Sequence, residues 1–362
     1  MVPRRRNMFA APRFVFLAAA LLSGSLATAQ EQSYPTFRVS GFADVNVSHS
    51  TRSNATDLDF GELDPYGEAQ FSDSWSALAE GLIQRHERGS DTDVPSRRRI
   101  ELDLERLFIA YSPSDAFRLQ VGQINSGIVE WNEREQLPRF LQTPIDVPSI
   151  AKRQEQGGAW PLHLIGGWVS GRVAGSAGLR YGIGIGEGRG RSRDDTAPLT
   201  GRTSAAGLLS VSFAPDSLTG WEIGGAALLD DIPAHEGTYR ELDETLSTSY
   251  IHGPIEFRGE WSQMNHRLRT GGPTNVTTGW YALLSSRLPG GLRQLRPYFL
   301  VDRLDVADDE PYLAEVSDQR AWAAGVRWDA TSKLVVKLDF RSQHARSPEF
   351  ERRLRLQLAL AF

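Results

Sequence analysis

The sequence predicts an all-β protein, a 16-stranded antiparallel transmembrane β-barrel with a long inward-folded constriction loop. Three observations lead to this prediction: the C-terminal segment, the lack of a membrane helix, and the spacing of the turns. In residues 353–362 the apolar side chains take every second place, at Leu354, Leu356, Leu358, Leu360 and Phe362. A period of two puts them on one face of a strand and the arginines on the other. A half-buried strand of a soluble β-sandwich has the same pattern, and the rest of the chain favours the barrel.

The N-terminal segment has the pattern of a secretory signal peptide. Arginines at positions 4, 5, 6 and 13 precede an unbroken apolar run at 14–22, and Ala27-Thr28-Ala29 offers a small-x-small cleavage site. The apolar run is too short to span a bilayer as a helix. We expect residues 1–29 to be a signal peptide and residues 30–362 to form the barrel. A retained anchor is the alternative.

The composition restricts the classes of function. The chain has no cysteine, so disulfides and thiolate metal sites are excluded. Beyond residue 30 no apolar run approaches 18 residues, and a closed barrel is the other structure that can cross a membrane. Net charge is −5, and removing four leader arginines gives −5 − 4 = −9, which argues against nucleic-acid binding. We expect no cofactor.

Segments of alternating polarity separated by turn residues predict sixteen strands. The expected ranges are 36–48, 57–71, 75–87, 98–111, 116–124, 161–172, 177–187, 203–213, 220–230, 239–252, 254–266, 275–288, 294–305, 319–329, 332–343 and 351–362. Short turns, such as 72–74 and 252–254, alternate with longer polar stretches, such as 88–97 and 231–238. Bacterial barrels have short periplasmic turns and long outer loops. An even strand number then leaves both termini on the periplasmic side.

Charged residues in these strands should point inward, because a charge on the lipid face costs about 2–4 kcal/mol at the midplane. The pore-lining candidates on strands are Arg38, Asp44, Glu80, Arg118, Glu256, Arg258, Glu260, Arg327, Lys333, Lys337, Asp339, Arg341, Arg353 and Arg355. Nine of these are basic and five acidic, which predicts a weak preference for anions. Strand 98–111 changes phase between Leu104 and Leu107, which predicts a β-bulge near Glu105-Arg106 or, alternatively, misplaced boundaries.

Residues 125–160 form the longest stretch without alternation. A structureless loop of this length is usually functional or disordered. Folded into a wide barrel it would narrow the pore, and an exposed, solvated loop is the alternative. Its candidate lining charges are Glu133, Arg134, Glu135, Arg139, Lys152 and Arg153. Glycines at 182, 184 and 186 are expected to make room for the inserted loop.

Several segments together resemble one family. They are residues 104–122, Trp131-Asn132, and the stretches 140–145, 162–166 and 181–186. Over roughly 57–190, and at the last strand, the chain resembles porins of the phosphate-selective porin O and P superfamily. The resemblance implies a 16-stranded barrel, usually trimeric, with loops folded inside. Phosphate-specific members line the path with lysines, and this chain has only Lys152, Lys333 and Lys337. Phosphate selectivity is therefore not predicted, and no individual binding residue carries over.

These features predict an outer-membrane porin for passive diffusion of small hydrophilic solutes, with a weak anion preference. The expected partners are outer-membrane lipid, a homotrimer of the chain, and the barrel-assembly machinery, through the strand that ends in Phe362. A barrel hydrolase and a non-conducting envelope or adhesion barrel are the alternatives. The seven histidines are scattered and no nucleophile motif accompanies them, so we predict no catalytic residue.

Overall fold

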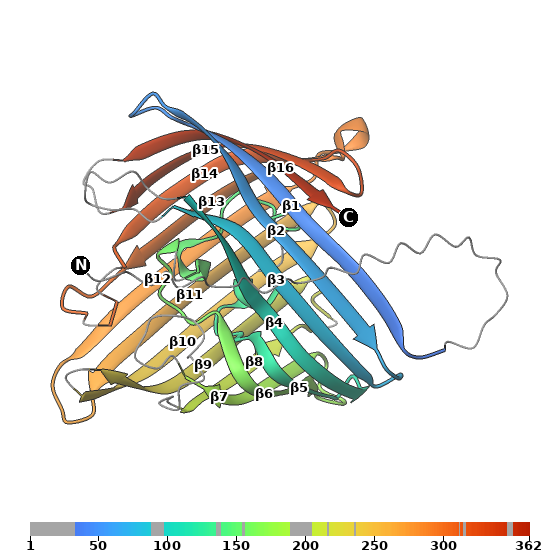
Figure 1. Cartoon of the computed structure of the whole chain (residues 1–362), viewed down its shortest axis with the longest axis vertical. Helices are drawn as coiled ribbons and strands as arrows, with labels where there is room; N and C mark the ends of the chain where they lie inside the picture. The colour runs from blue at the N-terminus through green and yellow to red at the C-terminus, as the bar shows by residue number, and fades with distance from the viewer. Residues whose placement is uncertain are drawn as a thin grey trace, which may run out of the picture. The chain divides into compact units, whose positions relative to one another are not determined.

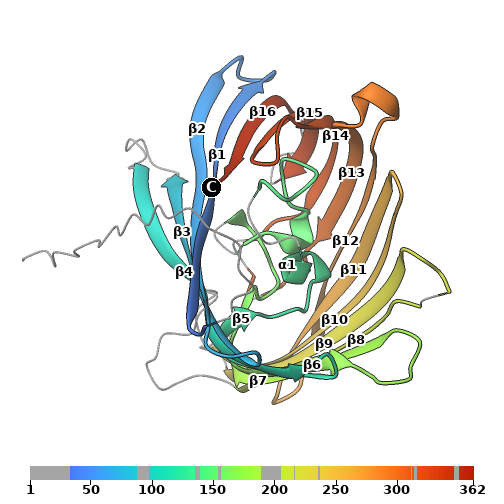
Figure 2. The same ribbon diagram turned by 90° about the vertical axis from the view of Figure 1, so that its right-hand side faces the viewer.

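The structure is a computed structural model that describes a closed antiparallel barrel of sixteen strands (Figures 1 and 2). The described residues are 33–87, 98–134, 139–153, 156–188, 205–215, 217–234, 237–310, 312–313, 316–345 and 350–362. Pro35–Phe362 forms one compact unit. The predicted signal peptide, 1–29, lies outside the described residues. No helix in the described part is long and apolar enough to cross a membrane.

Each strand pairs with its neighbours in sequence, and β1 closes the barrel on β16. The strands are β1 Thr36–Ser50, β2 Thr56–Gln70, β3 Trp75–Glu87, β4 Arg98–Ser114, β5 Phe117–Asn125, β6 His163–Arg172, β7 Leu179–Glu187, β8 Ala205–Phe213, β9 Trp221–Ala234, β10 Gly237–His252, β11 Ile255–Leu268, β12 Thr274–Ser286, β13 Leu295–Asp305, β14 Gln319–Asp329, β15 Leu334–Ala345 and β16 Glu351–Ala361. The short helices are α1 Glu130–Arg134 and the 3-10 turns η1 Ser149–Ala151 and η3 Gly290–Leu292. All sixteen predicted strands are confirmed.

The largest boundary error concerns the hairpin of β9 and β10. A long connection was expected around 231–238, but β9 runs to Ala234 and β10 begins at Gly237. Ile232 and Tyr239 face each other in the ladder, and both are buried on the inner face of the wall. These apolar side chains continue the two strands past the point where the polar residues suggested a loop.

The two faces of the wall differ as the period of two requires. On β16 the four leucines at 354, 356, 358 and 360 are 40–49% exposed on the outer face. Gln357 and Ala359, between them, are 1% and 0% exposed. On β15 Leu338 is exposed, whereas its neighbours Lys337 and Asp339 are buried. The outer face is therefore apolar, and the ionic side chains of these strands turn inward.

The predicted β-bulge is present in β4. Glu80 pairs with Arg106, but the next residue, Gly81, pairs with Leu104, so the register shifts by one residue at Glu105. Because of this extra residue, the leucines before and after the bulge lie on the same, outer face of the strand, where all of them are exposed. Glu105 itself is buried on the inner side.

The prediction that the glycines of β7 make room for the inserted loop is wrong. A side chain at Gly182 or Gly184 would collide with the indole of Trp168, which lies on the neighbouring strand β6. Trp168 is buried on the inner face. Gly182 and Gly184 therefore make room for this tryptophan, whereas an added Cβ on Gly186 would meet Ile165 and Leu164 of β6.

Candidate functional site

The segment between β5 and β6, residues 126–162, packs against the inner face of the barrel and is called the inner loop here. Residues 135–138 and 154–155 of it lie outside the described part. Figure 2 shows α1 within the ring of strands. Ile128, Trp131, Ile150 and Trp160 are at most 1% exposed and share an apolar cluster with inward side chains of the wall.

Helix α1 is held by β11 and β12. The backbone N–H groups of Glu130 and Trp131 donate to the carboxylate of Glu260, at 2.7 and 3.4 Å. These N–H groups open the helix and have no partner within it. The indole of Trp131 meets Tyr281 edge-on, with ring centroids 5.3 Å apart. The position of α1 is thus fixed at its first turn.

Two buried cations of the wall bind backbone oxygens of the inner loop. Lys337, which is 0% exposed, donates to the carbonyls of Arg139 and Pro144. Arg327 donates through one nitrogen to the carbonyls of residues 140–142, at 2.8, 3.0 and 2.8 Å. A buried cation needs such acceptors because burial without hydrogen bonds is costly. Here the acceptors come from the loop.

Asp146 of the inner loop lies between two arginines. Its carboxylate is 2.7 Å from Arg355 and 3.4 Å from Arg341. Arg355 also binds Asp339, and Arg341 lies 3.6 Å from Asp302. Burial acts to raise the pKa of Asp146, but Arg355 and Arg341 outweigh it and hold this pKa below its usual range. Asp146 is therefore anionic under ordinary conditions.

The η1 turn docks on β12, β13 and β14. The Ser149 N–H donates to Asp302 at 3.1 Å, and Lys152 donates to Gln319 at 2.6 Å. Burial lowers the pKa of Lys152, with a further contribution from Arg341.

The bulge residue Glu105 supplies an anchor from the other side of the barrel. Its carboxylate is 3.3 Å from Arg153 of the inner loop and 3.4 Å from Nε2 of His163. Arg139 reaches Glu62 of β2 at 3.2 Å. The bulge thus directs the carboxylate of Glu105 inward, where it binds Arg153 of the inner loop.

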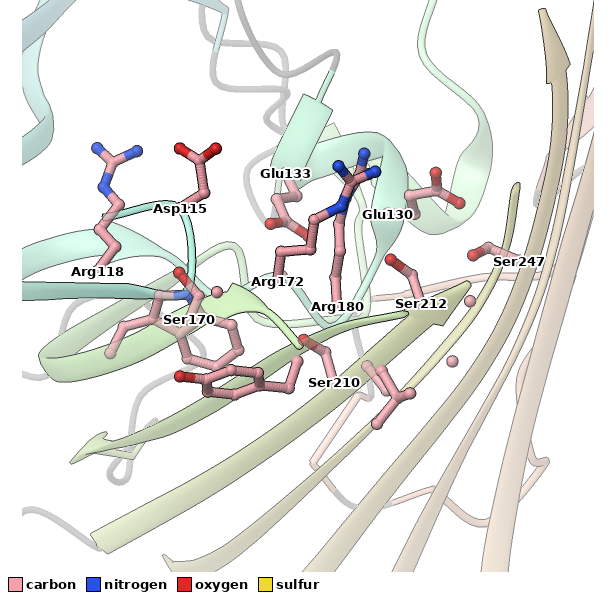
Figure 3. Close-up of a pocket in the computed structure, with 18 of the residues that line it drawn as sticks. Asp115, Arg118, Glu130, Glu133, Ser170, Arg172, Arg180, Ser210, Ser212 and Ser247 are labelled. Carbon is pink, nitrogen blue, oxygen red and sulfur yellow. The ribbon is translucent and has the colours of Figure 1, made fainter. Parts of the chain in front are cut away.

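A cavity of about 560 Å³ lies between the inner loop and the wall formed by β4 to β10. Figure 3 shows Arg172 and Arg180 extending from the wall towards the helix that carries Glu130 and Glu133. The charged lining consists of Arg118, Arg172, Arg180, Asp115, Glu130 and Glu133. The polar wall includes Ser112, Ser114, Ser170, Ser210, Ser212, Thr245 and Ser247. The lining therefore combines three cations with three carboxylates and many small hydroxyl side chains.

The structure separates the predicted lining residues into groups. Arg118 and Glu133 line the cavity. Asp44, Glu80, Glu260, Arg327, Lys337, Asp339 and Arg341 face inward but are buried, and Glu256, Arg258 and Arg355 are half-buried. The inner loop packs on that side of the wall, so most of these charges hold protein groups instead of facing an open water column.

The remaining predicted residues are not part of the described lining of the cavity. Arg38 and Lys333 are exposed, and Arg353 pairs with Glu351 at 2.8 Å. Arg134 is in α1, where its side chain is not described, and Glu135 lies outside the described residues. Arg172 and Arg180 were not identified from the sequence. Arg172 lies four residues after the buried Trp168 on β6, so its side chain is on the same, inner face of the strand.

Comparison with solved structures finds the same barrel in outer-membrane proteins. The anion-selective porin from Comamonas acidovorans superposes with a TM-score of 0.64 at 12% identity, over 91% of this chain and 100% of that one. OmpF of Salmonella typhi in complex with daunomycin gives 0.62 at 12% identity, over 90% and 97%. The outer membrane channel DcaP of Acinetobacter baumannii gives 0.59 at 10% identity, over 93% and 100%. No protein-family model matches the chain, and a search of curated protein sequences gives no match. The chain has the fold of these porins and channels.

Proposed function

We propose that this protein is an outer-membrane porin through which small hydrophilic solutes diffuse passively. The observation that carries the proposal is the polar cavity between the inner loop and the wall of β4 to β10, inside a barrel whose outer face is apolar. In a closed barrel the backbone N–H and C=O groups of the strands form hydrogen bonds with one another. Such a barrel with an apolar outer face can therefore lie in a membrane. A polar interior then provides a path for water.

The inner loop sets the size limit in this proposal. Its anchors come from β1, β2, β4 and β11 to β16, among them the contacts of Arg139, Asp146 and Lys152. The loop therefore occupies one side of the lumen, and the cavity lies on the other. This asymmetry supports the proposal that the inner loop constricts the pore.

The weak preference for anions that the strand charges predicted gains no support from the charged lining of the cavity. Three arginines and three carboxylates line the cavity, so their fields largely offset each other. The described lining contains no lysine, which gives no support to the phosphate selectivity of the superfamily that the sequence resembles. We propose no catalytic activity, and two of the structures that share the fold are described as an anion-selective porin and an outer membrane channel.

The remaining parts of the proposal concern the assembly of the protein. We propose that residues 1–29 are removed on export, that three copies associate in the outer membrane, and that Phe362 at the end of the last strand is read by the barrel-assembly machinery. The C-terminal backbone lies in the wall, where the Phe362 N–H donates to the Gly41 carbonyl at 2.9 Å.

Single-channel recording tests the porin function. Purified protein added to a planar bilayer should give stepwise ohmic currents in potassium chloride. Proteoliposomes should swell in small sugars at rates that fall steeply with sugar size, because the inner loop narrows the path. A folded barrel that gives neither current steps nor swelling would reject the proposal.

A further inference from the structure

We propose that His266 is a positioning residue that holds the connection between β13 and β14 inside the barrel, where this connection narrows the lumen beside the inner loop. The described residues of the connection are 306–310, 312–313 and 316–318, and they are called the second inner segment here. This inference rests on the proposed porin function and adds a second element that limits solute size.

The second inner segment packs in the interior of the barrel. A long connection between strands is expected to be an outer loop. Leu313 is fully buried, however, and Val316 is buried as well. Both belong to the same apolar cluster as Ile150 and Trp160 of the inner loop. An exposed loop would leave these apolar side chains in water, so burial inside the barrel stabilises the inward position.

A buried histidine joins the segment to the wall. Nε2 of His266 on β11 lies 2.6 Å from the carboxylate of Glu241, its direct ladder partner on β10. Nδ1 lies 2.9 Å from the carboxylate of Glu310 in the segment. The side chains of all three residues are at most 2% exposed. The imidazole therefore bridges a carboxylate of the wall and a carboxylate of the segment.

Neighbouring contacts show which part of the segment depends on this bridge. On β12, the Thr277 hydroxyl accepts from the Ala307 N–H at 3.4 Å, and the Asn275 amide donates to the Asp309 carbonyl at 3.0 Å. These contacts hold the beginning of the segment. Further along, the ring of Tyr312 meets the imidazole of His266 edge-on, with centroids 5.6 Å apart. His266 thus contacts the part of the segment that leads to Leu313.

The bridge needs the positive charge of the imidazole. Each ring nitrogen faces a carboxylate oxygen, and only the protonated ring has a donor on both sides. Without a cation between them, the carboxylates of Glu241 and Glu310 would repel each other in a buried site. Removing one partner of a buried ion pair changes an equilibrium by about a hundredfold or more. Loss of the charge at His266 should therefore release the segment.

Release of the segment should widen the path for solutes. The inner loop and the second inner segment belong to one apolar cluster, so both take up part of the lumen. When the segment leaves, its buried side chains leave with it, while the hydrogen-bonded wall stays closed. The size limit for solutes should then rise.

A thiol at position 313 reports release directly, because the chain has no cysteine and Leu313 is fully buried. In the Leu313→Cys background, His266→Gln should raise the rate of labelling by a water-soluble thiol reagent about a hundredfold or more. Glu310→Gln should raise it less, by about tenfold, because the bridge to Glu241 remains. The matched control is His252→Gln, which changes an exposed histidine at the turn end of β10 and should leave the rate unchanged.

Proteoliposome swelling with the same variants, in the natural Leu313 background, tests the effect on solute size. His266→Gln should raise the rate for a trisaccharide relative to that for a monosaccharide by several fold, and His252→Gln should not.

A double variant separates the charge of His266 from the shape of its ring. In His266→Gln/Glu310→Gln one of the two repelling carboxylates is removed, so position 313 should be labelled more slowly than in His266→Gln alone. If only the shape of the ring mattered, the second change would add to the damage and labelling would be as fast or faster.

Unchanged labelling in His266→Gln, or faster labelling with an unchanged size limit, would overturn the inference. Equal or faster labelling in the double variant would overturn the role of the charge. If His266→Gln gives no folded barrel, Glu310→Gln decides: its labelling and its size limit should both rise, and a failure of either would overturn the inference. Failure of the unchanged protein to admit the monosaccharide would instead reject the porin function, whatever the labelling shows.

Discussion

The contact between Ile150 and Gly279 gives a direct test of how the inner loop sits on the wall. Ile150 is fully buried, and its side chain occupies the place where a Cβ on Gly279 of β12 would lie. Gly279→Ala should therefore overpack the site at a cost of about 1–3 kcal/mol. Ile150→Ala should cost about 2–5 kcal/mol through lost burial and the cavity left behind. In the double variant the new methyl group fills part of that cavity, so the combined cost should fall short of the sum by about 1–2 kcal/mol.

Tryptic cleavage after Lys152 and Arg153 reports release of the inner loop, because both residues are held against the wall. When opening and closing are fast, the cleavage rate follows the population of the open form, and 1.4 kcal/mol corresponds to about tenfold. Gly279→Ala should raise the rate by about 5- to 100-fold. Gly207→Ala, on β8, is the matched control because nothing lies within 4 Å of its added Cβ. Additive effects of the two changes, or equal effects of the two glycine variants, would refute the docking of Ile150 on Gly279.

Three further predictions concern the anchors and the C-terminus. Lys337→Met should leave the buried carbonyls of Arg139 and Pro144 without this donor, at a cost of about 1–3 kcal/mol for each unsatisfied group. The inner loop should then be cleaved faster by trypsin, and single-channel currents should be noisier. An unchanged cleavage rate would contradict this prediction. The pKa of Asp146 in the folded protein lies below its usual range, so its charge stabilises the fold. This stabilisation is complete above the pKa of the unfolded chain, about 3.9, and is lost only as the pH falls through the pKa of the folded protein. Relative to cleavage of an unfolded substrate at the same pH, which corrects for the pH dependence of trypsin, cleavage should then be the same at pH 7 and pH 5, and Asp146→Asn should accelerate it at both. A rise in this relative rate between pH 7 and pH 5 in the unchanged protein would count against the anchor. Phe362→Ala should lower the yield of heat-modifiable barrel in the outer membrane without stopping export, and an undiminished yield would argue against recognition of this residue.

The barrel could be predicted because lipid and water sort side chains at every second position. Leu354 to Leu360 on β16 and the leucines of β4 follow this rule, and the change of phase in β4 located the bulge at Glu105. Both strands of the β9–β10 hairpin were predicted, but its end near Ile232 and Tyr239 was misplaced because polar neighbours there resemble a loop.

The site could be predicted only in part, because it depends on where the inner loop docks. The inward direction of Lys337 was predicted from its place in β15. Its binding to carbonyl oxygens of residues nearly two hundred positions earlier has no local signal. The same holds for Arg172 and Arg180, whose strands look apolar and glycine-rich. Their opposition to Glu133 arises only when the inner loop folds back over them.

Blocking the cavity tests the account most directly. The chain has no cysteine, so Ser212→Cys introduces a single thiol into the cavity lining, and Leu356→Cys places one on the outer face of β16 as a control. A bulky, water-soluble thiol reagent should lower the single-channel conductance of Ser212→Cys and leave that of Leu356→Cys unchanged. Full conductance of Ser212→Cys after complete labelling would contradict passage of solutes along β4 to β10.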